Sequence, residues 1–178
     1  NLIEDLYKRT RRYFDSGNLP GSPDDPEIET SRAQIRQQLL KHHAPEGCHR
    51  LLERFPLSLL SRGDPEQLAE EICFASQRLA EGAETICTSR YDAHLKAMRY
   101  TVIHRENELS IGTFARATGA LSSYGLVILR AQIETIGDEL AWDDFWVTDP
   151  EYPEEPTPGR ATEVCRRVTH LLDTPDEE

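Results

Sequence analysis

Residues 113–149 read TFARATGALSSYGLVILRAQIETIGDELAWDDFWVTD, and this stretch decides the fold. Its first part is rich in small residues and has apolar residues at helical spacing up to Gly125, which suits the left-handed position that ends a helix. From 126 to 136 the apolar residues alternate with a second, mostly polar series, as in a half-buried strand: Val127, Leu129, Ala131 and Ile133. Gly137-Asp138 predicts a tight turn, and an aromatic strand follows at 140–148. The stretch therefore predicts a helix, a strand, a hairpin turn and a second strand.

Further elements flank this stretch. Residues 84–91 and 97–104 have the pattern of two more strands. Ser110 is a suitable cap for a helix that runs to about Tyr124, and a last helix is predicted over 160–172. An ordinary ferredoxin-like domain ends in a strand that lies beside its first strand. The order strand-strand-helix-strand-strand-helix predicted here lacks that final strand. We therefore predict an α+β, ferredoxin-like fold, an antiparallel sheet with two helices, in which 84–91 replaces that strand and lies next to 97–104.

The first 82 residues are predicted to be a helical linker region with a loop at 16–27, because that loop is rich in proline, glycine and acidic residues. Helices are expected at 1–15, 28–43, 48–55 and 64–82. The last of these has the clearest start, since Asp64 can cap it, Pro65 suits its first position and Gln67 completes a capping-box pattern. We place the α+β domain at 83–172 and a disordered acidic tail at 173–178.

Composition excludes several classes of partner. The net charge is −12, which disfavours binding to nucleic-acid phosphate or to an anionic membrane surface. No apolar run approaches the roughly 20 residues that a membrane span needs. The four cysteines are scattered and form no CxxC pair, which favours reduced thiols in a cytoplasmic protein: Cys48, Cys73, Cys87 and Cys165.

The sequence contains no pattern typical of a catalytic or metal site. Asp143 and Asp144 are adjacent, but alternation along a strand places them on opposite faces of the sheet, so they are a poor acid-base pair. The cluster formed by His42, His43, Cys48 and His49 matches no familiar zinc spacing. We expect neither a metal nor a cofactor.

The central stretch resembles the first ACT domain of the bacterial protein-PII uridylyltransferase/uridylyl-removing enzymes. That family has a Phe-Ala-Arg-x-x-Gly-Ala-Leu helix, and this chain supplies Phe114, Ala115, Arg116, Gly119, Ala120 and Leu121. The two family strands that follow are matched by Ile128, Leu129, Ala131, Ile133 and Thr135, and then by Ala141, Asp143, Phe145, Val147, Asp149 and Pro150. Two weaker matches lie upstream in the same order, in NLIEDLYKRT (1–10) and RFPLSLLSRGDPEQLAEEI (54–72).

The resemblance implies a regulatory role. In the family, ACT domains sense glutamine and set the balance between attachment of UMP to the PII protein and its removal. The catalytic nucleotidyltransferase and HD domains of the family lie upstream, and this chain shows the motifs of neither, so we expect it to be non-catalytic. A homodimer and the PII protein are the other expected partners.

The resemblance also implies where an amino acid would bind. The family's Asp-x-Pro-Gly-Leu-Phe loop corresponds here to 108–114, in which Gly112 is retained and Ile111 replaces the proline. We expect the ligand to contact the loop and the next strand, through Glu108, Leu109, Ser110, Gly112, Thr113 and Gln132. The alternative is an ACT-like structural or dimerisation module whose ligand loop is degenerate.

Overall fold

The computed structural model describes residues 26–61, 64–105, 112–137 and 139–174. The chain divides into two compact units, 1–77 and 78–178, and each is considered by itself. The helix expected at 1–15, most of the loop expected at 16–27 and the end of the expected tail lie outside the described residues.

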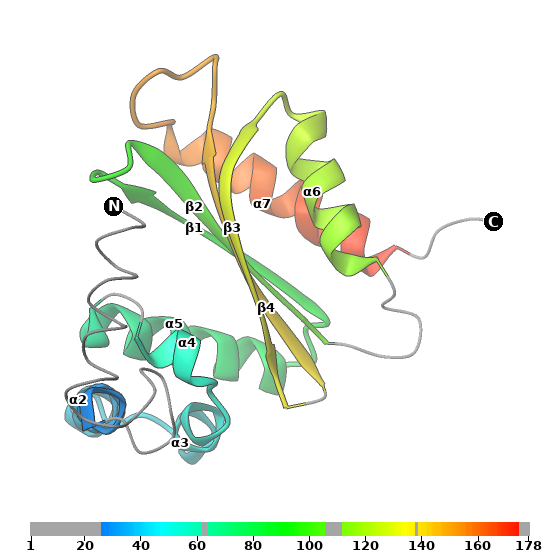
Figure 1. Ribbon diagram of the computed structural model, residues 1–178. Coiled ribbons are helices and arrows are strands. Elements are labelled where there is room, and N and C mark those ends of the chain that lie inside the picture. Colours follow the sequence, from blue (N-terminus) through cyan, green and yellow to red (C-terminus); the bar gives the residue numbers. More distant parts are fainter. Residues whose placement is uncertain (1–25, 62–63, 106–111, 138, 175–178) are drawn as a thin grey trace, which may run out of the picture. The chain divides into compact units, whose positions relative to one another are not determined.

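The first unit is helical in its described part. Its helices are α2 (Pro26–Lys41), α3 (Glu46–Glu53), α4 (Leu57–Leu60) and α5 (Pro65–Ala80), the last of which extends into the second unit (Figure 1). Helix α2 begins at Pro26, inside the range expected to be loop. The apolar stripe of each helix is buried, and the largest fully buried side chains of the unit are Ile35, Leu39, Leu52, Leu59 and Ile72.

The start of α5 agrees with the sequence only in part. The Asp64 carbonyl accepts a hydrogen bond from Leu68 N–H at 3.0 Å, and Asp64 Oδ1 accepts one from Glu66 N–H at 3.4 Å. Asp64 therefore accepts the first intrahelical hydrogen bond through its carbonyl, and its side chain satisfies one of the N–H groups that a helix start leaves without partners. Gln67 Nε2 donates to Glu71 Oε1 at 2.9 Å, one turn further along the helix, and the capping-box role of Gln67 stays a prediction.

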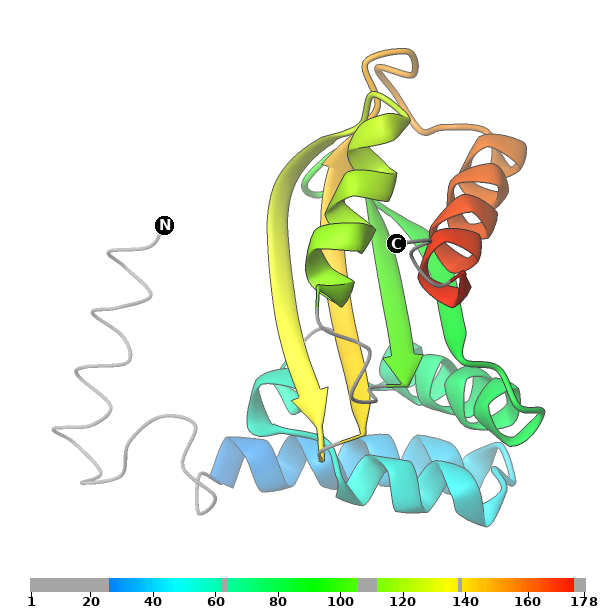
Figure 2. The ribbon, with the colours of Figure 1, turned by 90° about the vertical axis from the view of Figure 1, so that its right-hand side faces the viewer.

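The second unit is a four-stranded antiparallel sheet with two helices on one face. The strands are β1 (Thr85–Asp92), β2 (Ala97–Arg105), β3 (Val127–Ile136) and β4 (Leu140–Thr148), in the spatial order β1-β2-β4-β3. Figure 2 shows α6 (Thr113–Ser123) and α7 (Pro158–Asp173) side by side on the same face of this sheet. Strand β1 pairs antiparallel with β2, with Cys87 opposite Val102, so the predicted replacement of the missing last strand is confirmed. The fold is α+β and ferredoxin-like, as predicted.

The core of this unit lies between the sheet and the two helices. It is built from the alternate residues of β2 and β4 that face the helices, and from one stripe of each helix: Met98, Tyr100, Val102, Phe145 and Val147 with Ala117, Ala120, Leu121, Ala161, Val164, Val168 and Leu172. Gly125 adopts φ +73° after the end of α6, as predicted for a residue that ends a helix.

Strand β3 departs from the predicted alternation. A bulge between Ile128 and Arg130 shifts its register against β4, so Ile128 packs on the core. The side chains expected on the buried face are instead largely exposed, at 50% for Val127, 54% for Leu129 and 53% for Ile133. The physical reason is that β3 is the edge strand of the sheet, with a partner on one side only among the described strands.

The face of the sheet opposite α6 and α7 carries aromatic and charged groups. Trp146 is buried, and its indole N–H donates to Asp92 Oδ2 at 3.2 Å. The Arg130 guanidinium lies 4.7 Å from the centre of the Trp146 ring, a cation–π distance. On the same face Thr101 donates its hydroxyl hydrogen to Asp144 Oδ1. Asp144 lies opposite Thr101 and Asp143 lies opposite the core residue Val102, so the two carboxylates occupy opposite faces, as predicted.

None of the described helices is both long enough and apolar enough to cross a membrane.

Candidate ligand site at the start of helix α6

Helix α6 begins at Thr113, and Gly112 is its N-cap residue. Ser110, which was expected to cap this helix, lies outside the described residues and is not the N-cap position. Gly112 adopts φ +94°, a left-handed conformation that L-residues with a side chain adopt only at a cost. The sequence expectation placed the helix start too early because it relied on the capping preference of serine and ignored the turn that glycine permits.

The backbone at this helix start suits an anion. The Gly112 carbonyl accepts the first intrahelical hydrogen bond, from Arg116 N–H at 2.8 Å. Glycine has no side chain with which to cap the N–H groups of the first turn. Those N–H groups, together with the positive end of the helix dipole, attract carboxylates.

Phe114 lies directly beside this helix start. Its ring stacks on Phe145, with centroids 5.8 Å apart and an interplanar angle of 21°. Phe145 is fully buried, whereas Phe114 is 41% exposed. An aromatic ring that is exposed on one side can cover the aliphatic part of a small ligand. Phe114 was not among the residues expected from the sequence to contact a ligand, although it comes directly after Gly112-Thr113.

Two arginines hold α6 at both ends. Arg116 donates to the carbonyls of Leu171 and Thr174 at the end of α7. At the other end, Arg160 of α7 donates to the carbonyl of Tyr124 at 3.1 Å. Because both ends are fixed to α7, the start of α6 is a defined position on the surface of the unit.

The structure does not bring all the expected site residues together. Gly112 and Thr113 lie at the start of α6, and Thr113 is buried. Glu108, Leu109 and Ser110 lie outside the described residues.

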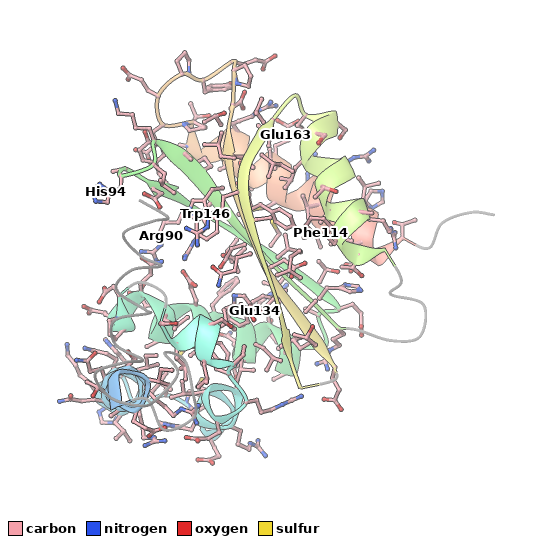
Figure 3. All side chains as sticks on the ribbon, in the orientation of Figure 1. Arg90, His94, Phe114, Glu134, Trp146 and Glu163 are labelled. Atoms are coloured by element: carbon pink, nitrogen blue, oxygen red, sulfur yellow. The ribbon has the colours of Figure 1, made fainter. Side chains whose placement is uncertain are left out.

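Gln132 lies on the opposite face of the sheet from α6, because it pairs with Asp144 in the β3–β4 register. Figure 3 shows this separation through Trp146 and Phe114, which lie on opposite sides of the sheet. Gln132 Nε2 donates to Glu134 Oε1 at 3.2 Å, and its own Oε1 is buried with no hydrogen-bond partner among the described residues.

Among the described residues no group of three or more histidine, cysteine, aspartate or glutamate side chains is arranged to hold a metal ion.

The chain is similar to the bifunctional uridylyltransferase/uridylyl-removing enzyme of Azospirillum brasilense. The two are 26% identical over 148 residues, which is 83% of this chain and 15% of the enzyme. A match of 148 residues leaves 30 of the 178 outside it, so residues 31–148 lie within the match and both units take part. The chain thus spans about 15% of the length of this distant relative. No family model matches the chain, and no solved structure matches it.

Proposed function

We propose that this chain is the regulatory, amino-acid-sensing part of a uridylyltransferase/uridylyl-removing enzyme. In this proposal residues 83–172 are an ACT domain, 1–82 are the helical linker that precedes it, and the chain itself is non-catalytic. The observation that carries the proposal is the similarity to the Azospirillum brasilense enzyme, which runs through both units and includes the whole sheet as far as Thr148. The strand order β1-β2-β4-β3 with both helices on one face supports it, because an ACT domain has this arrangement.

The proposed ligand is glutamine or another small amino acid. Its carboxylate would accept hydrogen bonds from the N–H groups of the first turn of α6, and its side chain would lie against Phe114. Glu108, Leu109 and Ser110, together with Gly112 and Thr113, would surround the rest of the ligand. Gln132 is omitted from this site, because the sheet separates it from the start of α6.

We further propose that two copies of the chain associate through β3. This strand is the edge of the sheet and exposes three large apolar side chains, those of Val127, Leu129 and Ile133. An exposed edge strand presents unpaired backbone groups that a second strand can pair with. In the whole enzyme, a ligand that binds one arrangement of the domains better than another would shift the balance between the upstream activities on the PII protein.

The test is calorimetric titration of the full chain with a panel of amino acids, with two glycine variants. Gly112 and Gly125 both adopt positive φ, and a Cβ added to either meets nothing within 4 Å. Alanine therefore costs about 1 kcal/mol of backbone strain at each position, but only Gly112 lies at the proposed site. We expect saturable binding of glutamine that Gly112→Ala weakens at least about tenfold and Gly125→Ala leaves unchanged.

The alternative is an ACT-like structural or dimerisation module, and the exposed edge strand β3 favours it. It predicts a stable dimer in sedimentation experiments and no heat of binding with any amino acid. That result would overturn the sensing proposal, as would equal loss of binding in the two glycine variants.

A further inference from the structure

The four cysteines, which are scattered in the sequence, meet as two pairs in the structure. In the helices of the first unit, the thiols of Cys48 on α3 and Cys73 on α5 are hydrogen-bonded. In the second unit, the thiols of Cys87 on β1 and Cys165 on α7 are hydrogen-bonded. All four are reduced in the structure. Each pair therefore brings together two sulfur atoms from different elements, which is the first requirement for a disulfide bond.

The Cys87–Cys165 pair lies where α7 crosses the edge strand β1. Cys87 lies opposite Val102, on the face of the sheet that α6 and α7 cover. Cys165 comes directly after Val164 on α7 and is partly buried against the same core. Both cysteines are half-buried at the margin of the core, so a small oxidant can reach them while the surrounding packing holds them together.

The two pairs differ in how readily they ionise. The hydrogen bond from Cys87, with a further one from Ser89, lowers the pKa of the Cys165 thiol below its usual value. The same hydrogen bond, together with burial, raises the pKa of Cys87. In the other pair, burial and the hydrogen bond with Cys48 raise the pKa of Cys73 to about 12. The thiolate is the reactive form of cysteine, so Cys165 is the more reactive partner of its pair, whereas the raised pKa of Cys73 disfavours its thiolate.

We propose that Cys87 and Cys165 form an oxidation site, at which a hydroperoxide converts the two thiols into an intramolecular disulfide bond. In the first step the Cys165 thiolate attacks a peroxide oxygen and the O–O bond breaks. A sulfenic acid forms, and the hydroxide that leaves takes up the proton that Cys165 had released and becomes one water. In the second step the Cys87 sulfur attacks the Cys165 sulfur, the S–O bond breaks, and a second water leaves with the Cys87 proton. The two thiols together lose two electrons, and hydrogen peroxide is reduced to two molecules of water.

The disulfide bond would attach the edge strand β1 covalently to α7. Helix α7 in turn accepts hydrogen bonds from Arg116 of α6 through its last carbonyls. Oxidation would therefore restrict the movement of α7 against the sheet. The proposal does not depend on any ligand bound at α6.

The experiment is peptide mapping by mass spectrometry of the full chain after treatment with stoichiometric hydrogen peroxide. We expect one disulfide, between Cys87 and Cys165, that a dithiol reductant reverses. Cys48→Ser and Cys73→Ser are the matched controls and should keep this cross-link at the wild-type yield. In Cys87→Ser the reaction should stop at a sulfenic acid on Cys165, which a dimedone reagent labels.

Two results would overturn the proposal. One is a cross-link between Cys48 and Cys73 that forms as fast as the expected one, and the other is oxidised protein that contains only intermolecular disulfides. If a serine variant fails to fold, native alkylation of the wild-type chain with iodoacetamide provides the second measurement. Cys165 must then react first, and faster labelling of any other cysteine would contradict the inference.

Discussion

Arg160 of α7 makes several different kinds of contact at once. Its Nε donates to Asp149 Oδ2 at 2.9 Å, and both side chains are largely buried. Its Nη2 donates to the Tyr124 carbonyl, and its guanidinium lies 5.1 Å from the centre of the Tyr124 ring. One side chain of α7 thus fixes both the end of α6 and the loop that follows β4.

Replacement of Arg160 should be costly because it leaves the Asp149 carboxylate buried without its cation. We expect Arg160→Ala to lower the free energy of unfolding by about 3 kcal/mol, as measured by urea denaturation. Arg167→Ala, an exposed arginine on the same helix, is the control and should change it by less than about 0.5 kcal/mol. Equal effects of the two variants would mean that the Arg160 contacts contribute nothing beyond those of a surface charge.

At the level of single residues, the sequence predicts a residue's role correctly where one backbone conformation favours only a few residue types. Gly125 and Asp64 were placed correctly, because a left-handed helix end and an N-cap each favour a few residue types. The role of Gln67 could not be fixed from the sequence in the same way, since a flexible side chain has several partners of similar energy, among them Glu71 one turn away. Ser110 was a suitable cap, but Gly112 lies closer to the actual helix start.

At the level of elements, β3 is the part of the fold with the clearest functional consequence. It has a strand partner on one side only among the described residues, and its exposed apolar side chains lie along a strand of ten residues. Natural proteins usually protect such edges with charges or prolines. Strand β3 carries such protection only in part: Arg130, Glu134 and the bulge at Leu129 interrupt the edge, whereas the three exposed apolar side chains remain available for the proposed dimer.

A lysine introduced on β3 should weaken this dimer. We expect Leu129→Lys or Ile133→Lys to raise the dimer dissociation constant at least about tenfold, because a charge would be buried in the new interface. Leu95→Lys is the control, since Leu95 is also exposed, at 47%, but lies in the turn between β1 and β2. Sedimentation velocity at several protein concentrations measures the constants. If Leu95→Lys has the larger effect, the interface is elsewhere.

The order and pairing of the strands could be predicted from the sequence, but the faces of β3 could not. Strand β1 was placed correctly because a ferredoxin-like sheet leaves one position for it beside β2. The exposure of β3 was missed for two reasons: local alternation does not show that the strand lies at the edge of the sheet, and a single-residue bulge at Leu129 brings Ile128 to the core. A bulge of this kind is set by pairing with another strand, so local alternation does not reveal it.

At the level of the whole molecule, charge opposes association. Each chain carries a net charge of −12, so two chains repel one another at low ionic strength. Association through β3 must therefore rely on apolar contacts and backbone hydrogen bonds, which salt screens little.

The dimer should consequently become tighter as salt is added. Raising NaCl from about 0.1 M to about 1 M shortens the Debye length from about 10 Å to about 3 Å and screens the repulsion. We expect the dimer dissociation constant to fall several-fold over this range in sedimentation equilibrium experiments. The Leu129→Lys variant serves as comparison, because its dimer should remain weak at both concentrations. A dissociation constant that rises with salt would show that ion pairs hold the dimer together.

The position of β1 has a consequence for how this fold tolerates rearrangement of its chain. Strand β1 precedes the rest of the domain in the sequence. It nevertheless occupies the position, and runs in the direction, of the strand that comes last in an ordinary ferredoxin-like domain. A circular permutant that moves residues 84–92 from the front of the domain to a point after α7 would restore the ordinary order without changing the sheet. We expect such a permutant to form the same sheet. In the chain order found here β1 and β2 are joined by a short turn and can pair directly as a hairpin, a possibility that the permutant would lose.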